Sequence, residues 1–431
     1  MPDTWMLTAV LCAFLAAPPL YSREEQGMPA DETSRGQCDT VQSIPEAGSV
    51  FREFTFVPRG RFFAECDPGS TREFCAERKH MTPKQLDLDL KHATRAEALI
   101  EYWGGHIGTA DQKFSANGNS WIPVPQPANT PTEPQRYYRN VMGTPPVAVP
   151  LEHLRDATNE FRFTCGRQIA YSFDWGFYWV YAFTIRVYYD PSLVAHPTGA
   201  IVFPASGSTV GDSPVLNVEA QSPNGPIRRA DLIAHYEDFD WGGNGWFRDW
   251  HYQYQHGSIT HHVGSADGPP FEITWDTSWV PDQTAPIKVA ARLTDDAGVS
   301  TMTDAVEIRL DRPDRSVRMY KPHDVPENFG SRVGRRKSCK IDVPDDLSGA
   351  TGARLVLSTW SAAHAEEIGL NGTILVPRIG QVHWFSYDAI AVPVQLLRRG
   401  ENEFHIFSRT EEHAAEVNWP GPVLLVEYPK R

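Results

Sequence analysis

The sequence is poor in cysteine, in positive charge and in long apolar runs, and each shortage argues against a class of protein. Only 6 of its 431 residues are cysteine, and none of them has the spacing of zinc ligands. The formal net charge of −14 at pH 7 opposes binding to nucleic acids and other polyanions. Beyond the N-terminal region, no stretch is long and apolar enough to span a bilayer. We therefore expect a soluble protein that does not bind nucleic acid.

The motifs of several common enzyme classes are also missing. The sequence contains no nucleophile elbow, no phosphate-binding loop and no dinucleotide fingerprint. The nearest match, GGHIG at residues 104–108, is too short and lacks the strand-to-helix setting that those motifs need. These absences favour a binding protein over an enzyme without deciding between them.

An apolar run at residues 5–17 ends in small residues and proline near Ser22. This pattern is typical of a secretory signal peptide, and it predicts a signal peptide over residues 1–22 and a secreted or periplasmic protein. Because no lysine or arginine precedes the run, an apolar N-terminus without a targeting role is the alternative. Residues 23–48 are polar and charged and contain proline and glycine, so we expect a flexible leader there.

The remaining cysteines allow a disulfide without requiring one. Five follow the apolar run: Cys38, Cys66, Cys75, Cys165 and Cys339. Cys66 and Cys75 enclose the turn-rich loop DPGSTREF, which could close as a small disulfide in an oxidising compartment. Two separate buried thiols are the alternative. The odd count leaves at least one thiol unpaired in either case.

Much of the C-terminal region is written a second time near the N-terminus. Five landmarks recur in the same order: Trp103 and Trp360, Asn117-Gly118 and Asn371-Gly372, Val149-Pro150 and Val392-Pro393, Asn159-Glu160-Phe161 and Asn402-Glu403-Phe404, and Trp175 and Trp419. The interval from the proline to the asparagine is nine residues in both versions. We interpret this as a duplicated domain, with a first copy at residues 49–190 and a second copy at residues 316–431. The recurring tryptophans are expected to pack in the core or at its rim.

Within each copy the pattern is that of a β-sandwich. The runs LDLDLKH and KIDVP alternate apolar and polar residues with period two, as in strands with one buried face. The Asn-Gly pairs predict tight turns, because both residue types tolerate positive φ. The stretches VPLEHLRDATNEFRF and VPVQLLRRGENEFHI predict a short turn followed by a strand with alternating phenylalanines.

The sequence LNG…VP followed by VPVQLLRRGENEFHI resembles the galactose-binding-like jelly-roll β-sandwiches. Such domains accompany many bacterial polysaccharide-degrading enzymes and occur as carbohydrate-binding modules. The resemblance covers both copies and implies a jelly-roll fold for each. It names no binding residue, because the shared motifs shape the sandwich and the glycan contacts of that family come from variable loops.

The segment between the copies, residues 198–312, also consists of short alternating strands separated by turn residues. The pattern VAARLTDDAG…T…VEIRL is similar to bacterial immunoglobulin-like domains, although a Cys-Trp-Cys framework is absent. The abundance of Pro (35) and Gly (32), with 11% aromatic residues, also favours short strands over helical bundles. We therefore expect an all-β protein of three β-sandwich domains: jelly roll, immunoglobulin-like and jelly roll.

Oxygen ligands and histidines crowd residues 235–262 of this middle segment. Glu237, Asp238, Asp240 and Asn244 lie close together among glycines, a composition that suits a hard cation such as Ca²⁺. Their spacing misses the EF-hand pattern, and a solvated loop is the alternative. The segment also holds five histidines, without HxH or HExxH spacing. Two of its carboxylates could instead form a glycosidase acid and base pair.

Aromatic residues give the clearer indication of a ligand, because sugar rings pack their C–H faces on exposed Trp and Tyr side chains. In the first copy the candidate binding residues are Trp121, Arg136, Tyr137, Tyr138, Tyr178 and Trp179. Three of them belong to a proline-rich loop at residues 126–144, for which a plain surface loop is the alternative.

These observations favour a secreted, non-catalytic protein that binds a carbohydrate or another extracellular polymer. Its two related modules are expected to be held apart by the middle segment, which would allow avidity if both bind one polymer. A glycoside hydrolase or polysaccharide lyase with its site in residues 235–262 is one alternative. A structural or adhesive cell-surface protein is the other. The sequence does not predict the oligomeric state.

Overall fold

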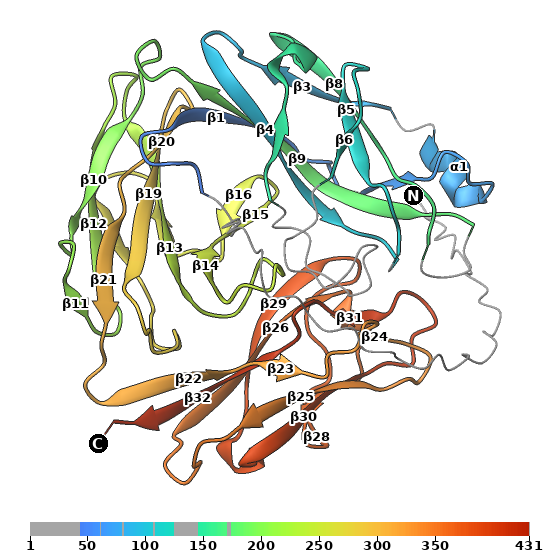
Figure 1. Cartoon of the computed structure of the whole chain (residues 1–431), viewed down its shortest axis with the longest axis vertical. Helices are drawn as coiled ribbons and strands as arrows, with labels where there is room; N and C mark the ends of the chain where they lie inside the picture. Colours follow the sequence, from blue (N-terminus) through green and yellow to red (C-terminus); the bar gives the residue numbers. More distant parts are fainter. Residues whose placement is uncertain are drawn as a thin grey trace, which may run out of the picture.

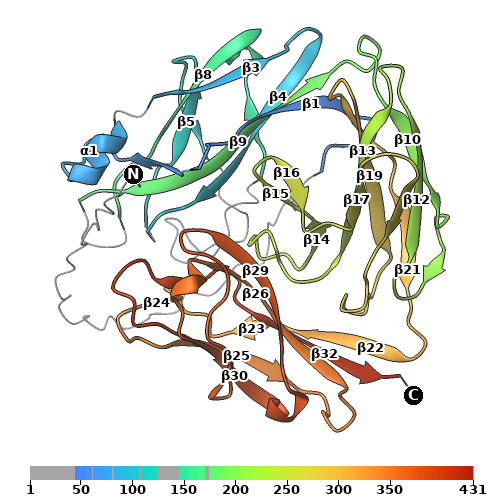
Figure 2. The same cartoon turned by 180° about the vertical axis from the view of Figure 1, so that it is seen from behind.

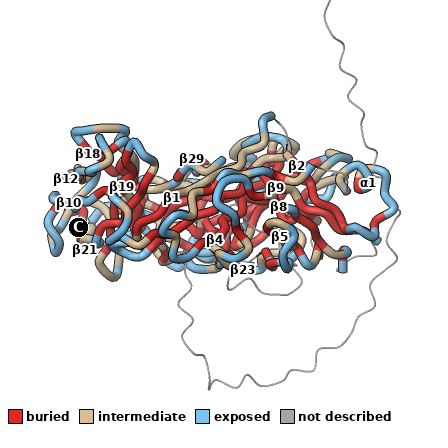
Figure 3. The backbone as a smooth tube through the Cα atoms, turned by 90° about the horizontal axis from the view of Figure 1, so that it is seen from above, coloured by how far each residue is buried: buried red, intermediate tan, exposed pale blue. Residues whose placement is uncertain are grey.

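The computed structural model describes residues 44–60, 62–79, 82–106, 108–124, 145–169 and 174–430. The fold is almost wholly β, which confirms the expected fold class, and α1 (Glu73–Lys79) is the one α-helix in these ranges. Three lobes surround a common centre (Figures 1 and 2). Seen edge-on, the described part of the molecule is flat, with buried residues along the sheets (Figure 3). Across these ranges we find no helix that is long and apolar enough to cross a membrane.

The first copy folds as two antiparallel sheets that face each other. The strand order of its first sheet is β1 (Val50–Phe56), β9 (Phe177–Tyr189), β4 (Ala93–Trp103) and β7 (Val147–Val149). The strand order of its second sheet is β3 (Lys84–Leu88), β8 (Ala157–Thr164), β5 (Lys113–Ala116) and β6 (Ile122–Pro123). A further strand, β2 (Phe63–Cys66), pairs with β9. Phe183 of the first sheet contacts Phe114 and Phe161 of the second, so the core lies between the sheets.

The second copy repeats this topology strand for strand. Its first sheet runs β22 (Arg315–Tyr320), β32 (Val423–Pro429), β26 (Gly352–Trp360) and β29 (Phe385–Ala391). Its second sheet runs β25 (Lys337–Val343), β30 (Gly400–Phe407), β27 (Glu367–Leu370) and β28 (Thr373–Val376). Three short strands extend these sheets: β23 (Pro322–His323), β24 (Gly330–Ser331) and β31 (Ala415–Val417). The repeat in the sequence is therefore also a repeat in strand order.

The recurring asparagines explain why the same turns form twice. In the first copy, Asn117 Nδ2 donates to Asn159 Oδ1 (2.9 Å), and Asn159 Nδ2 donates to the carbonyl oxygen four residues earlier (2.7 Å). In the second copy, Asn371 Nδ2 donates to Asn402 Oδ1 and Asn402 Nδ2 donates to the corresponding carbonyl oxygen, both at 2.8 Å. Asn117 and Asn371 both have φ 52°, as predicted for Asn-Gly turns. The 3₁₀ turns η1 (Leu151–His153) and η3 (Val394–Leu396) precede the equivalent strands β8 and β30. A third turn, η2 (Ala362–His364), follows β26.

The middle segment also has two sheets, and one of them continues into the first copy. That sheet contains β11 (Thr209–Val210), β21 (Val306–Leu310), β19 (Ile287–Asp295), β20 (Ser300–Met302), β13 (Ile227–Glu237), β14 (Arg248–His251) and β17 (Gly264–Ala266). The other contains β10 (Thr198–Phe203), β12 (Val215–Gln221) and β18 (Phe271–Thr274). A separate hairpin is formed by β15 (Gln253–Gln255) and β16 (Ser258–Thr260). Because β20 pairs with β1, a single 12-stranded sheet crosses the expected boundary between residues 190 and 198. The predicted domain boundaries therefore remain predictions, because a shared sheet does not decide whether the two segments fold as separate units.

Buried ion pairs reinforce this shared sheet. Glu53 on β1 accepts hydrogen bonds from Arg186 Nε (2.8 Å), Arg292 Nη2 (2.8 Å) and the Tyr254 hydroxyl (2.6 Å). Arg186 also donates to Glu97 of β4 at 2.6 Å. Burial alone would raise the pKa of Glu53, but the charges of Arg292 and Arg186 outweigh burial and lower the pKa to about 2. Residues from the first copy and the middle segment thus form one charge network.

The expected separation of the two copies is wrong. The rings of Trp103 and Trp360 stack at a centroid distance of 4.2 Å and an interplanar angle of 9°. Both tryptophans belong to one hydrophobic core cluster, together with residues from β4, β9 and β29. The middle segment lies beside the two copies and does not hold them apart, because the ring of lobes closes on itself (Figure 1).

The described cysteines are all buried thiols. Cys66, Cys75, Cys165 and Cys339 form no disulfide in this structure. The structure thus has the alternative of two buried, unlinked thiols at Cys66 and Cys75. A hydrogen bond with Cys75, followed by burial, raises the pKa of Cys66. Cys38, the signal peptide expected at residues 1–22 and most of the expected leader lie outside the described residues.

Candidate functional site

Aromatic and histidine side chains gather where the two copies meet. We call the following set the junction cluster: Phe62, Trp103, Trp179, Tyr181, Trp360, His383, Trp384, His413 and Glu416. Its members come from β4, from β9 and the residue before β2, from β26 and β31, and from the residues just before β29 and β31. The cluster therefore joins the ends of strands that are equivalent in the two copies.

Two reciprocal hydrogen bonds fix the tryptophan pair at its centre. Trp103 of the first copy donates its indole N–H to Glu416 Oε2 of the second copy (3.1 Å). Trp360 of the second copy donates its indole N–H to the hydroxyl oxygen of Tyr181 of the first copy (2.7 Å). Because buried polar groups need partners, these bonds specify how the copies dock.

Two aromatic side chains of β9 face the junction. Trp179 and Tyr181 contact the second copy through His383 and Trp384. They are two residues apart, the spacing at which strand residues share a face. The pairing of β9 with β4 has a β-bulge here, since Glu101 pairs with Ala182 and Tyr102 pairs with Val180.

The rim of the junction cluster is only partly buried. Phe62 stacks between Trp179 (5.6 Å between centroids) and Trp384 (5.1 Å), with interplanar angles of 20° in both pairs. The rings of His383 and His413 meet edge to face at 4.6 Å. All five of these side chains are half-buried: Phe62, Trp179, Trp384, His383 and His413. A row of rings with polar nitrogens beside it therefore reaches the surface.

Burial keeps the titratable groups of the junction cluster uncharged. It raises the pKa of the Glu416 carboxyl well above its ordinary value, and the hydrogen bond from Trp103 offsets only part of this. Burial also lowers the pKa of His413 to about 3, with further lowering by His383 and His106. The pKa of His383 is lowered mainly by burial as well. Burial therefore favours the uncharged form of the acid and of the neighbouring imidazoles.

The middle segment adds histidines to the same belt of rings. The ring centroid of His256, in the turn between β15 and β16, lies 4.8 Å from that of Trp384. The ring centroid of His261 lies 4.4 Å from that of Tyr387 of β29, and the His261 ring stacks on Trp241 with 5.2 Å between centroids. Two of the five histidines in residues 235–262 thus approach the second copy, whereas His251 is buried and contacts the carbonyl oxygen of Tyr236 (2.9 Å).

The proposed oxygen ligands of calcium do not converge. Asp240 accepts hydrogen bonds from the backbone N–H groups of Asn244 (3.2 Å) and Gly245 (2.7 Å), so it closes its own loop. Asn244 Nδ2 donates to Asp249 (2.8 Å), and Glu237 pairs with Lys321 at 3.2 Å. Throughout the described ranges, no group of three or more His, Cys, Asp or Glu side chains could hold a metal ion. The calcium expectation therefore has no geometric site among these residues.

Two of the same carboxylates, Asp238 and Asp240, are buried and held by hydrogen bonds. Burial raises the pKa of Asp240 to about 7, and the neighbouring Asp249 raises it further while backbone N–H groups lower it. Burial likewise raises the pKa of Asp238 to about 7, against hydrogen bonds from Phe239, Tyr236 and Trp241. These contacts lie within the loop, so the carboxylates hold the loop in its folded shape.

The predicted aromatic ligands have different fates. Trp121 is 46% exposed, as a stacking residue must be. Trp179 belongs to the junction cluster, but Tyr178 is fully buried, with its hydroxyl 3.4 Å from the carbonyl oxygen of Lys113. Successive strand residues point to opposite faces, so Tyr178 and Trp179 cannot serve one surface. The remaining three predicted residues lie outside the described ranges: Arg136, Tyr137 and Tyr138.

Sequence reasoning missed the histidines and the acid of the junction cluster. His383, His413 and Glu416 lie in loops or at a strand end, without a motif that marks them. The recurring tryptophans were the available signal, because Trp103 and Trp360 occupy equivalent strand ends and are both buried. That signal gives their burial but not their mutual contact, which depends on how the lobes pack.

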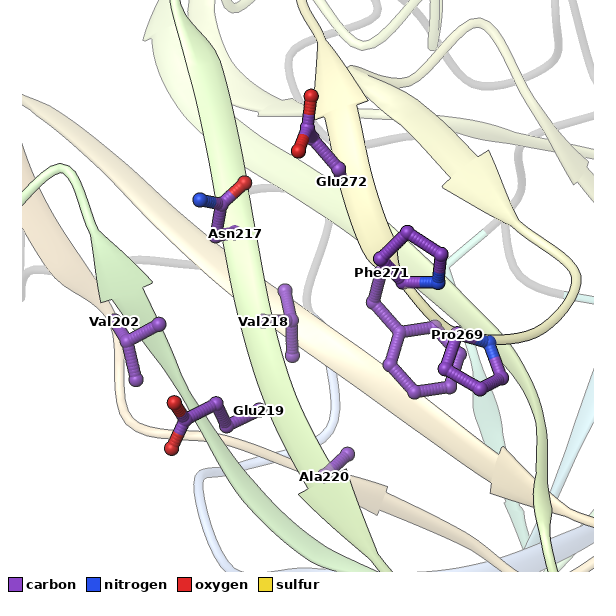
Figure 4. Close-up of a pocket in the computed structure, with 9 residues that line it drawn as sticks. Val202, Asn217, Val218, Glu219, Ala220, Pro269, Phe271 and Glu272 are labelled. Carbon is purple, nitrogen blue, oxygen red and sulfur yellow. The ribbon is translucent and has the colours of Figure 1, made fainter.

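A separate hollow of about 410 Å³ lies on the sheet β10-β12-β18. Asn217, Glu219 and Glu272 line it, together with Val202 and Phe271 (Figure 4). Its polar side chains come from neighbouring strands, since Asn217 pairs with Glu272. None of the sequence-predicted site residues lines this hollow, and its two carboxylates give it a negative character.

No family model and no curated protein matches this chain. Among solved structures, it is similar to a beta-porphyranase of glycoside hydrolase family 86 from the human gut bacterium Bacteroides plebeius, with 14% identity and a TM-score of 0.23, over 50% of this chain and 35% of that one. It is also similar to BuGH86wt in complex with neoagarooctaose (11% identity, TM-score 0.23, 51% and 33% covered). Fibronectin(III)-like modules of Clostridium thermocellum CbhA match with 10% identity and a TM-score of 0.17, over 49% of this chain and 94% of theirs. The chain spans about a third of the length of the first two proteins. These TM-scores are too low to transfer a fold or a function.

Proposed function

We propose that this chain is a secreted, non-catalytic glycan-binding protein and that the junction cluster is its binding site. The observation that carries the proposal is the row of half-buried rings formed by Trp179, Phe62 and Trp384, with His383 and His413 beside it. Glycan sites combine aromatic rings with a few polar groups that fix the orientation of the sugar.

The histidines supply those polar groups. The Nε2 atom of His383 is buried and has no hydrogen-bond partner among the described residues. A neutral imidazole offers one donor and one acceptor, and burial lowers the pKa of His383, so it stays neutral at neutral pH. A sugar hydroxyl is a suitable partner for such an atom, because it can donate or accept.

The proposal replaces two separate sites with one composite site. The two copies contribute different parts of the same ring row: Phe62 and Trp179 come from the first copy and Trp384 from the second. One glycan chain per protein is therefore the expected stoichiometry, and avidity between distant modules is not needed.

Catalysis on the same ligand is the second candidate, and Glu416 is the observation that favours it. A carboxyl group whose pKa is raised by burial can act as a general acid, and burial raises the pKa of Glu416 well above its ordinary value. A neutral His383 or His413 would be the base that a lyase needs. A glycoside hydrolase would need a second carboxylate at about 5–9.5 Å from the first.

The test is retention on a panel of insoluble polysaccharides, with released sugar measured in the same tubes. Wild-type protein, Trp384→Ala, Trp384→Phe, Trp121→Ala and Trp246→Ala are compared. Trp246 is the matched control, because it is 43% exposed and lies outside the cluster. We expect Trp384→Ala to lose about tenfold or more in affinity, as for other stacking residues worth about 1–3 kcal/mol, and Trp384→Phe to recover most of it.

Two results would overturn the assignment of the site. Equal retention of Trp384→Ala and wild type would show that the junction cluster is not the binding site. A loss of retention with Trp121→Ala alone would place the site at the exposed rim of the first copy. Sugar release by wild-type protein would establish catalysis instead of simple binding. Thermal melting of every variant separates lost binding from lost folding.

A further inference from the structure

A second hollow, of about 440 Å³, lies between the turn of the β15–β16 hairpin and the sheet of the middle segment. Its volume is within the range of about 300–1,000 Å³ that is typical of small-ligand sites. Its lining is mainly polar, and the side chains that matter here are Arg228, Arg229, Arg292, Asp231, Asp267 and Ser258. The hairpin turn belongs to the predicted segment 235–262, but none of the individually predicted site residues lines the hollow.

One of the three arginines is already neutralised. Arg229 Nε donates to Asp231 Oδ1 and its Nη1 donates to Asp267 Oδ1, both at 2.7 Å. Ser265 Oγ, which accepts from Arg229 Nη2, donates to Asp231 (2.6 Å). The two carboxylates of the hollow are therefore engaged in hydrogen bonds and ion pairs.

Arg292, which also lines the hollow, has one donor without a hydrogen-bond partner among the described residues. Its Nη2 donates to Glu53 (2.8 Å) and its Nη1 to the Tyr254 hydroxyl (3.1 Å), so its charge is compensated. Its Nε atom is buried and has no hydrogen-bond partner among the described residues, and the side chain is 12% exposed. An unpaired buried N–H is unfavourable and calls for an acceptor.

Arg228 supplies the free positive charge. It is exposed at the rim of the hollow, and within the described ranges no ion pair or hydrogen bond of its side chain is found. Ser258 and Thr294 complete the lining, but the Thr294 hydroxyl is already hydrogen-bonded to Ser300 Oγ at 2.8 Å. One free guanidinium, one unused N–H and the Ser258 hydroxyl form a set of donors for a group with several oxygen acceptors.

We propose that this hollow binds a single oxyanion on a sugar, either a carboxylate or a sulfate ester. Guanidinium groups bind both of these planar or tetrahedral oxyanions through charge-assisted hydrogen bonds. The sugar part of this inference rests on the function proposed for the junction cluster. A single anionic group is required, because the net charge of −14 repels long polyanions.

The hairpin turn connects the hollow with the junction cluster. His256 contacts Trp384 (4.8 Å between ring centroids), and the next two residues, Gly257 and Ser258, line the hollow. Glu101 holds this turn, because it accepts hydrogen bonds from the backbone N–H groups of His256 (2.7 Å) and Gly257 (2.8 Å). An oligosaccharide that stacks at the junction can therefore place a charged substituent near the hollow.

The experiment is calorimetric titration of the full chain with glucose, glucuronate and glucose 6-sulfate. Wild type is compared with Arg228→Gln and with the control Arg378→Gln, whose exposed arginine lies in the second copy. We expect at least one charged sugar to bind about tenfold more tightly than glucose, with an affinity that falls as NaCl is added. Arg228→Gln should lose most of that preference and Arg378→Gln none.

The outcomes separate this inference from the proposed function. Binding of glucuronate alone or of the sulfate alone identifies the oxyanion. Equal affinity for glucose and both charged sugars, or equal behaviour of the two arginine variants, would overturn the inference while retention on neutral polysaccharides still supports the junction cluster. Charged-sugar binding that depends on Arg228, without retention on any polysaccharide, would uphold the hollow and overturn the proposed function.

Discussion

The two copies have the same strand order and the same asparagine-centred turns, yet their outer edges differ. In the first copy, β1 pairs with β9 on one side and with β20 of the middle segment on the other. In the second copy, the equivalent strand β22 pairs with β32 alone, as far as the described residues show. The turns thus repeat the fold, whereas the edges and the docking faces make the two copies different.

The charges on these two edges differ accordingly. Glu53 on β1 is buried among Arg186 and Arg292. Arg318 on β22 pairs with Asp345 at the surface, where the two side chains are 49% and 32% exposed. The value of an ion pair depends on its burial, so the comparison can be tested by removing one charge from each edge.

The largest effect is expected for Glu53→Gln. The change leaves Arg186 and Arg292 buried without their carboxylate, and breaking a buried pair in this way costs about 3–5 kcal/mol. The free energy of unfolding in urea measures it. Wild type should also lose stability as pH falls from about 4.5 to about 2, because the lowered pKa of Glu53 stabilises the ionised folded state, and the variant should lose less over that range. A cost below 1 kcal/mol would show that the shared sheet does not depend on this network.

A smaller and equal effect is expected for Asn159→Ala and Asn402→Ala. Both side chains are fully buried and make the same hydrogen bonds in their copies. Each truncation leaves buried backbone groups unsatisfied, at about 1–3 kcal/mol. Chemical denaturation should give two costs that agree within about 1 kcal/mol. A larger difference would mean that the similar turns are not equally important to their copies.

The contact between the copies should depend on pH through Glu416. Since burial raises its pKa above the ordinary 4.5 in the folded state, the unfolded chain releases the proton first and wild type loses stability as pH rises from about 4.5. Glu416→Gln keeps an acceptor for the Trp103 N–H but has no proton to lose. Relative to wild type, its stability should rise with pH by up to about 1.4 kcal/mol per unit. Melting temperatures at pH 5 and pH 8 measure the change, and a constant difference would refute it.

The smallest effect is expected for Asp345→Asn on the edge of the second copy. Its pair with Arg318 is partly exposed, and such pairs contribute about 0.2–1 kcal/mol. The Tyr320 hydroxyl, which donates to Asp345 at 2.6 Å, retains an acceptor in the amide. Urea denaturation of Asp345→Asn and of Glu53→Gln compares the free energy of unfolding that is lost at each edge. Equal costs would remove the distinction between them.

The local parts of the fold can be predicted from the sequence, and the contacts between lobes cannot. Alternation predicts strands that overlap β3 and β25, and the Asn-Gly pairs predict turns at Asn117 and Asn371, because neighbouring residues alone decide these features. The burial of Trp103 and Trp360 follows from their recurrence. Their mutual stacking depends on the packing of distant strands, for which one sequence carries no local signal. The same reason explains why the sequence does not identify Glu416 and His413.

The pairing of β1 with β20 also has a consequence for protein synthesis. The first strand of the first copy leaves the ribosome long before its partner around Ser300 and Thr301 exists. Until then one edge of β1 has unpaired backbone groups, and such edges recruit strands from other chains. The first copy therefore completes its sheet only after most of the chain has been made, and a fragment that ends near residue 190 should self-associate where the full chain does not.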